Sequence, residues 1–280
     1  AQIIANGTAD QPIVMTSGKS PRRRGDWSGL MVIGKAKSNH PSGTFPEGQT
    51  ARTEWAYGST GADRNDDDDS GVISYVRVEW AGYQLAVGNE INAFSFYAVG
   101  RGTKLDHLQA HQGLDDSFEF FGGTVNGKYL MASSGNDDCF DMDNGYSGKL
   151  QFGICVRDDV DGGGNGFEVD NDANGSINVP LTNPTVYNFT LIGKGGTPTT
   201  EGGFGFHLRR NTTGTWRNIV AVNWPLAGLF IDGAAAQANA TAGSLSVRNS
   251  IIGGLTKNGN DAYADAYIAN AANGIRTAAV

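Results

Sequence analysis

The chain has 280 residues but only 2 cysteines, 8 prolines and 4 histidines. It also lacks an apolar run of the ~20 residues that a membrane-spanning helix needs, so we expect no membrane span. Cys139 and Cys155 do not have the spacing of a zinc site. They are compatible with a disulfide in an exported protein and equally with two free thiols.

Basic residues are scarce as well: 21 Lys and Arg stand against 29 Asp and Glu, which gives a formal net charge of −8. An acidic surface repels nucleic acids and anionic membranes, so we expect neither as a partner. Residues 1–4 lack the basic and apolar regions of a signal peptide and have the pattern of a strand interior. We therefore expect that a leader segment precedes them.

Glycine is abundant, at 41 residues, and short apolar segments recur between the glycine-containing turns. One series consists of triplets in which any residue separates two apolar ones, at 94–96, 118–120, 140–142, 167–169, 206–208 and 229–231. A second series of short strand-like segments, which includes 76–80, 105–108, 129–131 and 151–154, is interleaved with it. Two interleaved series at this period indicate a solenoid. They predict an all-β fold, a right-handed parallel β-helix with two or three strands per turn.

We expect the β-helix to be a single domain over residues 1–280 with irregular corner loops. The section from about 38 to 70 is the most irregular and rich in loops. Residues 255–280 form a C-terminal cap or tail, in which the alanine-rich stretch 262–272 is the one candidate for a short helix.

The middle residue of each triplet faces solvent if the flanking apolar pair faces the core. Acidic residues then stack on one face of neighbouring turns. Two carboxylates about 4.8 Å apart repel by about 3.5 kcal/mol at an effective dielectric of 20. A bound hard cation or a raised pKa would offset this repulsion, so the cluster predicts a site. The predicted ligand-binding residues are Glu119, Asp141, Glu168, His207 and Arg209. The predicted catalytic residues, if the protein is an enzyme, are Asp116, Asp137 and Asp138.

Two further acidic stretches, 63–71 and 158–165, resemble calcium loops because oxygen-bearing side chains are closely spaced and glycine allows tight curvature. Neither matches the complete EF-hand loop, and a solvated acidic turn is the alternative for each. The predicted Ca²⁺ ligands are Asp63, Asp66, Asp67, Asp68, Asp69, Asp158, Asp159 and Asp161.

His107 directly follows Asp106 within a strand. Because successive strand residues point to opposite faces, we expect no pairing between these two side chains. The chain also has no Gly-x-Ser-x-Gly elbow, so nothing indicates a nucleophile triad.

Asp116 and the Asp137-Asp138-Cys139 segment one turn later resemble the acidic positions of polygalacturonase-type glycoside hydrolases, which are right-handed β-helices. The Gly-His-Gly of that family would fall at 164–166, where Asn165 replaces the histidine. Segments 70–79, 89–93 and 118–125 resemble a large group of bacterial exported and cell-surface β-helix proteins. This broader resemblance implies the fold and an extracellular or cell-surface location.

Two functions from different classes are compatible with these features. The first is a calcium-stabilised surface protein that binds polysaccharide or matrix components, or assembles end to end through open end rungs. The second is a polysaccharide-cleaving enzyme. An inverting hydrolase would hold two carboxyl groups of the acidic cluster roughly 6.5–9.5 Å apart. A lyase would need a base, for which Lys128, Arg157, Arg209 and Arg210 are the candidates.

Overall fold

The computed structural model describes residues 1–40, 44–46, 53–58, 63–86, 89–157, 163–196, 202–253 and 262–278. Their strands form an eleven-stranded sheet and a seven-stranded sheet. The eleven-stranded sheet contains β1 (Ile3–Asn6), β2 (Ile13–Met15), β4 (Gly71–Glu79), β6 (Lys104–His111), β8 (Asn126–Ser133), β10 (Lys149–Val156), β12 (Thr185–Ile192), β14 (Gly214–Val222), β16 (Leu245–Arg248), β17 (Ile251–Gly253) and β18 (Arg276–Ala278). The seven-stranded sheet contains β3 (Leu30–Ile33), β5 (Phe94–Tyr97), β7 (Phe118–Phe121), β9 (Phe140–Asp143), β11 (Phe167–Val169), β13 (Phe206–Leu208) and β15 (Phe230–Ile231).

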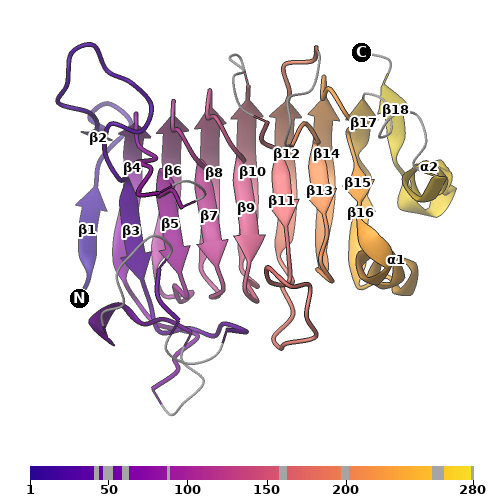
Figure 1. The fold of residues 1–280 in the computed structure, drawn as a ribbon, viewed down its shortest axis with the longest axis horizontal. Coiled ribbons are helices and arrows are strands. Elements are labelled where there is room, and N and C mark those ends of the chain that lie inside the picture. Colours follow the sequence, from indigo (N-terminus) through magenta and orange to yellow (C-terminus); the bar gives the residue numbers. More distant parts are fainter. Residues whose placement is uncertain are drawn as a thin grey trace.

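The chain alternates between the two sheets, and successive strands of each sheet pair in parallel. Figure 1 shows the resulting coil, in which each turn lies beside the one before it from the N-terminal to the C-terminal end. This confirms the right-handed parallel β-helix expected from the two interleaved series. The handedness agrees with the strong preference of parallel crossovers for the right hand.

A stack of phenylalanine rings fills the core beneath the seven-stranded sheet. The first apolar residue of each triplet supplies one fully buried ring, and neighbouring centroids lie 5.0 to 5.5 Å apart. The rings belong to Phe94, Phe118, Phe140, Phe167 and Phe206. Each buried ring contributes about 1.5–3 kcal/mol, so this ladder fixes the register of the turns.

Among the described residues, two helices pack on the C-terminal turns: α1 (Gly233–Ala242) and α2 (Ala262–Ala269), the latter followed by the 3-10 helix η3 (Ala271–Asn273). The sequence indicated α2 but not α1. The small side chains of Ala236 and Ala240 in α1 join the core, so this helix has no wide apolar stripe to reveal it. The one sequence feature that marks the C-terminal end of α1 is Gly243, the C-cap residue, which adopts a left-handed conformation with a φ of 82°.

Cys139 and Cys155 form a disulfide with Cα atoms 6.0 Å apart. Cys139 directly precedes β9 and Cys155 lies in β10, so the bond links the two sheets through the core. The structure therefore decides between the two alternatives that the sequence left open.

The described residues of the loop-rich section 38–70 include the 3-10 helix η1 (Thr53–Trp55), and some of them contact turns of the coil. Asn39 donates its side-chain amide to the Asn171 carbonyl at 2.8 Å, far away in the sequence. No helix of the described residues is long and apolar enough to cross a membrane.

Candidate functional site: an acidic groove

The middle residues of the triplets form one column on the outer face of the seven-stranded sheet. The register pairs each with the corresponding residue of the next strand. From β5 to β13 the column consists of Ser95, Glu119, Asp141, Glu168 and His207. It arises because each triplet buries its flanking apolar residues, which forces the middle side chain outward.

A second column lies two positions before each core phenylalanine. Asp116 Oδ1 accepts the backbone N–H of Asp138 at 2.9 Å, and Asp138 in turn accepts the N–H of Asn165. Asn165 continues the ladder by accepting the N–H of Phe204 at 3.1 Å. These side chains therefore join one turn to the next, and each is almost completely buried.

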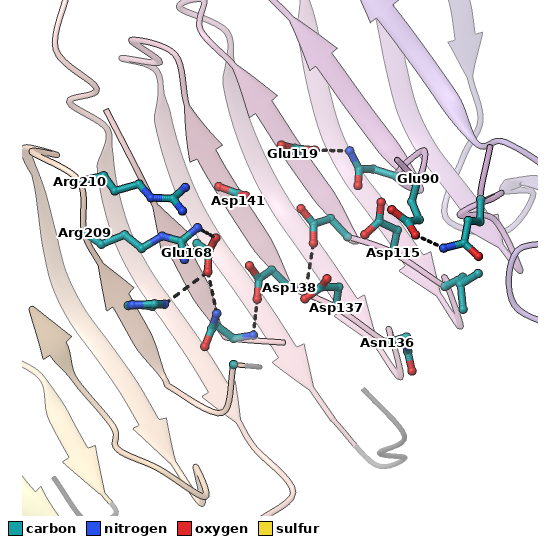
Figure 2. A pocket seen from close by; sticks show the side chains of 17 residues that line it. Glu90, Asp115, Glu119, Asn136, Asp137, Asp138, Asp141, Glu168, Arg209 and Arg210 are labelled. Carbon is teal, nitrogen blue, oxygen red and sulfur yellow. Dashed lines mark hydrogen bonds and ion pairs between the residues drawn. The ribbon is translucent and has the colours of Figure 1, made fainter. Parts of the chain in front are cut away.

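The two columns line an open groove of about 1040 Å³, shown in Figure 2. It contains all eight residues predicted as ligand-binding or catalytic. Its described lining is largely polar and includes no Phe, Tyr or Trp. The lining residues are Gln84, Glu90, Asn92, Leu114, Asp115, Asp116, Glu119, Asn136, Asp137, Asp138, Asp141, Asn165, Glu168, Gly202, His207, Arg209 and Arg210.

Carboxylate oxygens in this groove are close together. Three groups each bring one oxygen per residue within 4.8 Å of one another: Asp115, Asp116 and Asp137; Asp116, Glu119 and Asp141; and Asp138, Asp141 and Glu168. Asp141 belongs to two of these groups. Its Oδ1 atom is buried and accepts no hydrogen bond from a described residue.

This crowding changes the acidity of the groove. Burial raises the pKa of Asp116, Asp138 and Asp141 well above the usual range of aspartate. The next cause is a nearby carboxylate, which is Asp138 for Asp116 and Glu168 for the other two. The folded structure is therefore more stable when each of these carboxyl groups keeps its proton or has a positive charge beside it.

Glu168 shifts in the opposite direction. Burial alone would raise its pKa, but the neighbouring His207 and Arg209 lower it overall. His207 Nδ1 lies 3.4 Å from Glu168 Oε2, and the Arg209 guanidinium contacts the other carboxylate oxygen. Arg209 also donates its Nε–H to Asp170 at 2.8 Å, and Arg210 pairs with the same carboxylate at 2.8 Å. The groove thus has positive side chains at the end formed by β11 and β13.

The aspartates of loop 63–71 take part in other contacts. Asp66 pairs with Arg64 at 2.7 Å, Asp67 pairs with Arg101 at 3.0 Å, and Asp69 accepts the N–H of Gly71 at 2.8 Å. Among the residues that the structure describes, none of Asp63 to Asp69 belongs to a close carboxylate group. Asp158, Asp159 and Asp161 lie outside the described residues. Calcium at either loop stays a prediction.

Asn92 and Asn165 also line the groove, although sequence reasoning did not select them. The Asn92 amide donates to Glu119 Oε2, and the Asn165 amide donates to Glu168 Oε2 at 3.0 Å. Both precede a core phenylalanine by two residues, as Asp116 and Asp138 do. An Asn/Asp-x-Phe pattern in four successive turns was the signal that could have found them.

A family model described as a pectate-lyase-like β-helix domain matches residues 1–279. The chain belongs to this family, which makes it a polysaccharide-related protein by class. No curated protein and no solved structure matches the chain in the other comparisons.

Proposed function

We propose that this protein is exported and binds polysaccharide in its acidic groove with the help of a divalent cation, Ca²⁺. The observation that carries the proposal is the central carboxylate group, Asp116, Glu119 and Asp141, whose oxygens lie within 4.8 Å of one another. Like charges at this separation repel by about 3.5 kcal/mol at an effective dielectric of 20. Only protons or a cation can remove that repulsion.

The residues present fit a hard cation. Ca²⁺ is held by six to eight oxygen atoms from carboxylates, carbonyls and water. Asp116, Glu119 and Asp141 would supply some of these oxygen atoms. A cation bound to the buried Asp141 Oδ1 would not have to displace a hydrogen bond from any described residue. A bound cation would supply positive charge that attracts carboxylates or hydroxyls of a glycan.

The surroundings of the group support a glycan ligand. The groove is open and polar, and it crosses several turns, so a chain molecule can lie along it. The disulfide between Cys139 and Cys155 supports export, because disulfides persist in oxidising compartments. End-to-end assembly stays a prediction, and α1 and α2 cover the C-terminal turns that it would need.

Calorimetric titration of the intact protein with CaCl₂ tests the cation. We expect binding at pH 7 accompanied by proton release, because the ligands must lose their protons. Asp141→Asn should weaken binding by about tenfold or more, which is about 1.4 kcal/mol or more. Asp10→Asn, a change at an exposed loop residue, is the matched control and should bind normally. Equal binding by both variants would contradict the proposed site.

A second candidate, glycoside hydrolysis, is favoured by the opposite pKa shifts of neighbouring carboxyls. The raised pKa of Asp138 suits a general acid, and the lowered pKa of Glu168 suits an ionised partner. Their nearest oxygens lie within 4.8 Å, below the roughly 6.5–9.5 Å that leaves room for water in an inverting enzyme. This separation is closer to the roughly 5–5.5 Å of retaining enzymes.

Release of reducing ends from a panel of polysaccharides tests hydrolysis. Activity that is lost in both Asp138→Asn and Glu168→Gln, with glycan binding retained, would establish the enzyme. Calcium-dependent glycan binding without any new reducing ends would leave the binding function alone.

A further inference from the structure

Four stacked aromatic rings lie on the outer face of the eleven-stranded sheet, which is not the sheet that carries the groove. Tyr75, His107, Tyr129 and Phe152 occupy the same position in β4, β6, β8 and β10. Their successive centroids lie 4.1, 4.4 and 5.2 Å apart, with planes within 20° of parallel. Tyr129 is 46% exposed and Phe152 is 39% exposed. We call these four residues the aromatic ladder.

The backbone at the aromatic ladder is left-handed. Its four φ angles lie between 50° and 63°, and the same position in β12 and β14 is left-handed as well. Those two strands carry Asn188 and Asn218, the residue type that tolerates this conformation best after glycine. Bulky side chains are disfavoured there. Folding alone therefore does not account for four of them, and strained positions of this kind often serve function.

Charge is segregated on the same face. Strands β8, β10, β12 and β14 contain no Asp or Glu, although the whole chain has 29 acidic residues. They do contain Lys128, Lys149 and Arg217, all exposed, and none of the three forms an ion pair with a described residue. Asp106 of β6 is the register neighbour of Lys128, and it forms an ion pair with Lys104 at 2.9 Å. From β8 to β14 an acidic protein thus presents only positive charge beside its exposed rings.

We propose that this face binds a linear anionic polysaccharide along the axis of the coil, independently of the acidic groove. Lys128 in β8 and Arg217 in β14 occupy the same register position, and Lys149 in β10 lies two residues earlier along its strand. The three cations therefore form a staggered row along the axis. A row of cations complements a linear polyanion. The exposed ring edges of Tyr129 and Phe152 lie beside the row and offer apolar contact to sugar rings.

Nucleic acid and a lipid bilayer fit these observations less well. Duplex DNA carries one negative charge per about 1.7 Å of its axis, far more than three cations spread over four turns can neutralise. A bilayer would favour cations around the whole apolar patch, whereas Lys128, Lys149 and Arg217 lie in the first halves of their strands. Both alternatives are outcomes of the test.

Retention of the intact protein on immobilised alginate, a uronic-acid polysaccharide, tests the proposal. EDTA is present throughout, so cation-dependent binding in the groove does not contribute. We expect retention that falls steeply with salt and is absent on neutral dextran. Lys128→Gln with Lys149→Gln should weaken retention by about tenfold. Lys35→Gln, at an exposed lysine outside this face, is the matched control.

Tyr129→Asn with Phe152→Asn tests the rings. Asparagine already occupies this position in β12 and β14, so the double variant should keep its fold and its melting temperature. Its retention should nevertheless fall by about tenfold. No retention of the parent protein, unchanged retention of both double variants, or tighter binding to anionic phospholipid vesicles or single-stranded DNA than to alginate would overturn the proposal.

Discussion

The carboxyl groups of Asp116, Asp138 and Asp141 make the protein respond to pH in an unusual direction. Their pKa values are raised in the folded state, so the folded protein binds more protons than the unfolded chain at any pH between the unfolded and the folded pKa values. Their contribution to stability is therefore present at low pH and is lost as pH rises through the folded pKa values. Glu168, whose pKa is lowered, contributes with the opposite sign.

We predict that the calcium-free protein melts at a lower temperature at pH 7 than at pH 5, and that Ca²⁺ removes most of this difference. Asp141→Asn, which takes one titrating group out of the cluster, should flatten the calcium-free profile. Differential scanning calorimetry across this range, with EDTA or with CaCl₂, measures both effects. A melting temperature that rises from pH 5 to pH 7 in EDTA would contradict the assigned shifts.

Tyr129 allows a test of backbone strain at one residue. Tyr129→Asn relieves about 1–2 kcal/mol of left-handed strain and removes ring stacking that is worth about 0.5–1.5 kcal/mol. We therefore predict an unfolding free energy that is unchanged or slightly higher. The control is Tyr187→Asn in β12, which is not left-handed and should destabilise. Urea denaturation compares the two, and equal losses would show that Tyr129 is not strained.

At the scale of strands, the two sheets differed in how well the sequence revealed them. In the seven-stranded sheet each triplet alternates regularly, so the outward column of Glu119, Asp141 and Glu168 followed from the pattern. In the eleven-stranded sheet an additional left-handed residue interrupts the alternation. Because strand alternation has a period of two, one additional residue inverts the face of every side chain after it.

The clearest failure of sequence reasoning at this additional residue was His107. Regular alternation placed it opposite Asp106, and that expectation was wrong. With a φ of 50°, His107 turns back so that its Nδ1 lies 3.0 Å from Asp106 Oδ1. The alternation of polar and apolar residues within one strand cannot predict such a turn, because the turn depends on the left-handed conformation that recurs at the same position in the neighbouring strands.

The core of the same sheet depends on one large and one small residue on adjacent strands. A Cβ atom at Gly153 in β10 would lie 2.0 Å from the Phe189 ring of β12, and that ring packs edge-on against Phe140 at 5.1 Å. Gly153→Ala should therefore overpack the core and cost about 1–3 kcal/mol.

Adding Phe189→Leu should restore part of that loss by making room for the new methyl group. Gly18→Ala is the neutral control, because a Cβ at Gly18 meets nothing within 4 Å. Chemical denaturation of the parent, the two single core variants and the double core variant measures the coupling, with Gly18→Ala denatured alongside. Strictly additive effects of the two core changes would show that the overlap is relieved in another way.

At the scale of the whole molecule, the disulfide ties the two sheets together within one turn. A cross-link that closes a loop of this size stabilises by about 3 kcal/mol in the chain-entropy description. We predict that Cys139→Ser with Cys155→Ser lowers the melting temperature while the groove still binds Ca²⁺, because neither sulfur lines it. A double variant with unchanged melting temperature would indicate that core packing alone holds this turn.

The two sheets also divide the charge of the molecule between them. Acidic side chains gather over the seven-stranded sheet, while β8 to β14 of the eleven-stranded sheet carry only positive charge. We therefore propose two binding surfaces of opposite charge: the groove for a cation with its glycan, and the face of the aromatic ladder for a polyanion.

The most direct test of the groove is an anomalous diffraction map from crystals grown with Ca²⁺ and soaked with a lanthanide that replaces it. We predict one strong peak within about 2.3–2.6 Å of oxygens from Asp116, Glu119 and Asp141. Peaks confined to other parts of the surface, or a groove whose carboxylates touch no ion at saturating concentration and pH 7, would contradict the account.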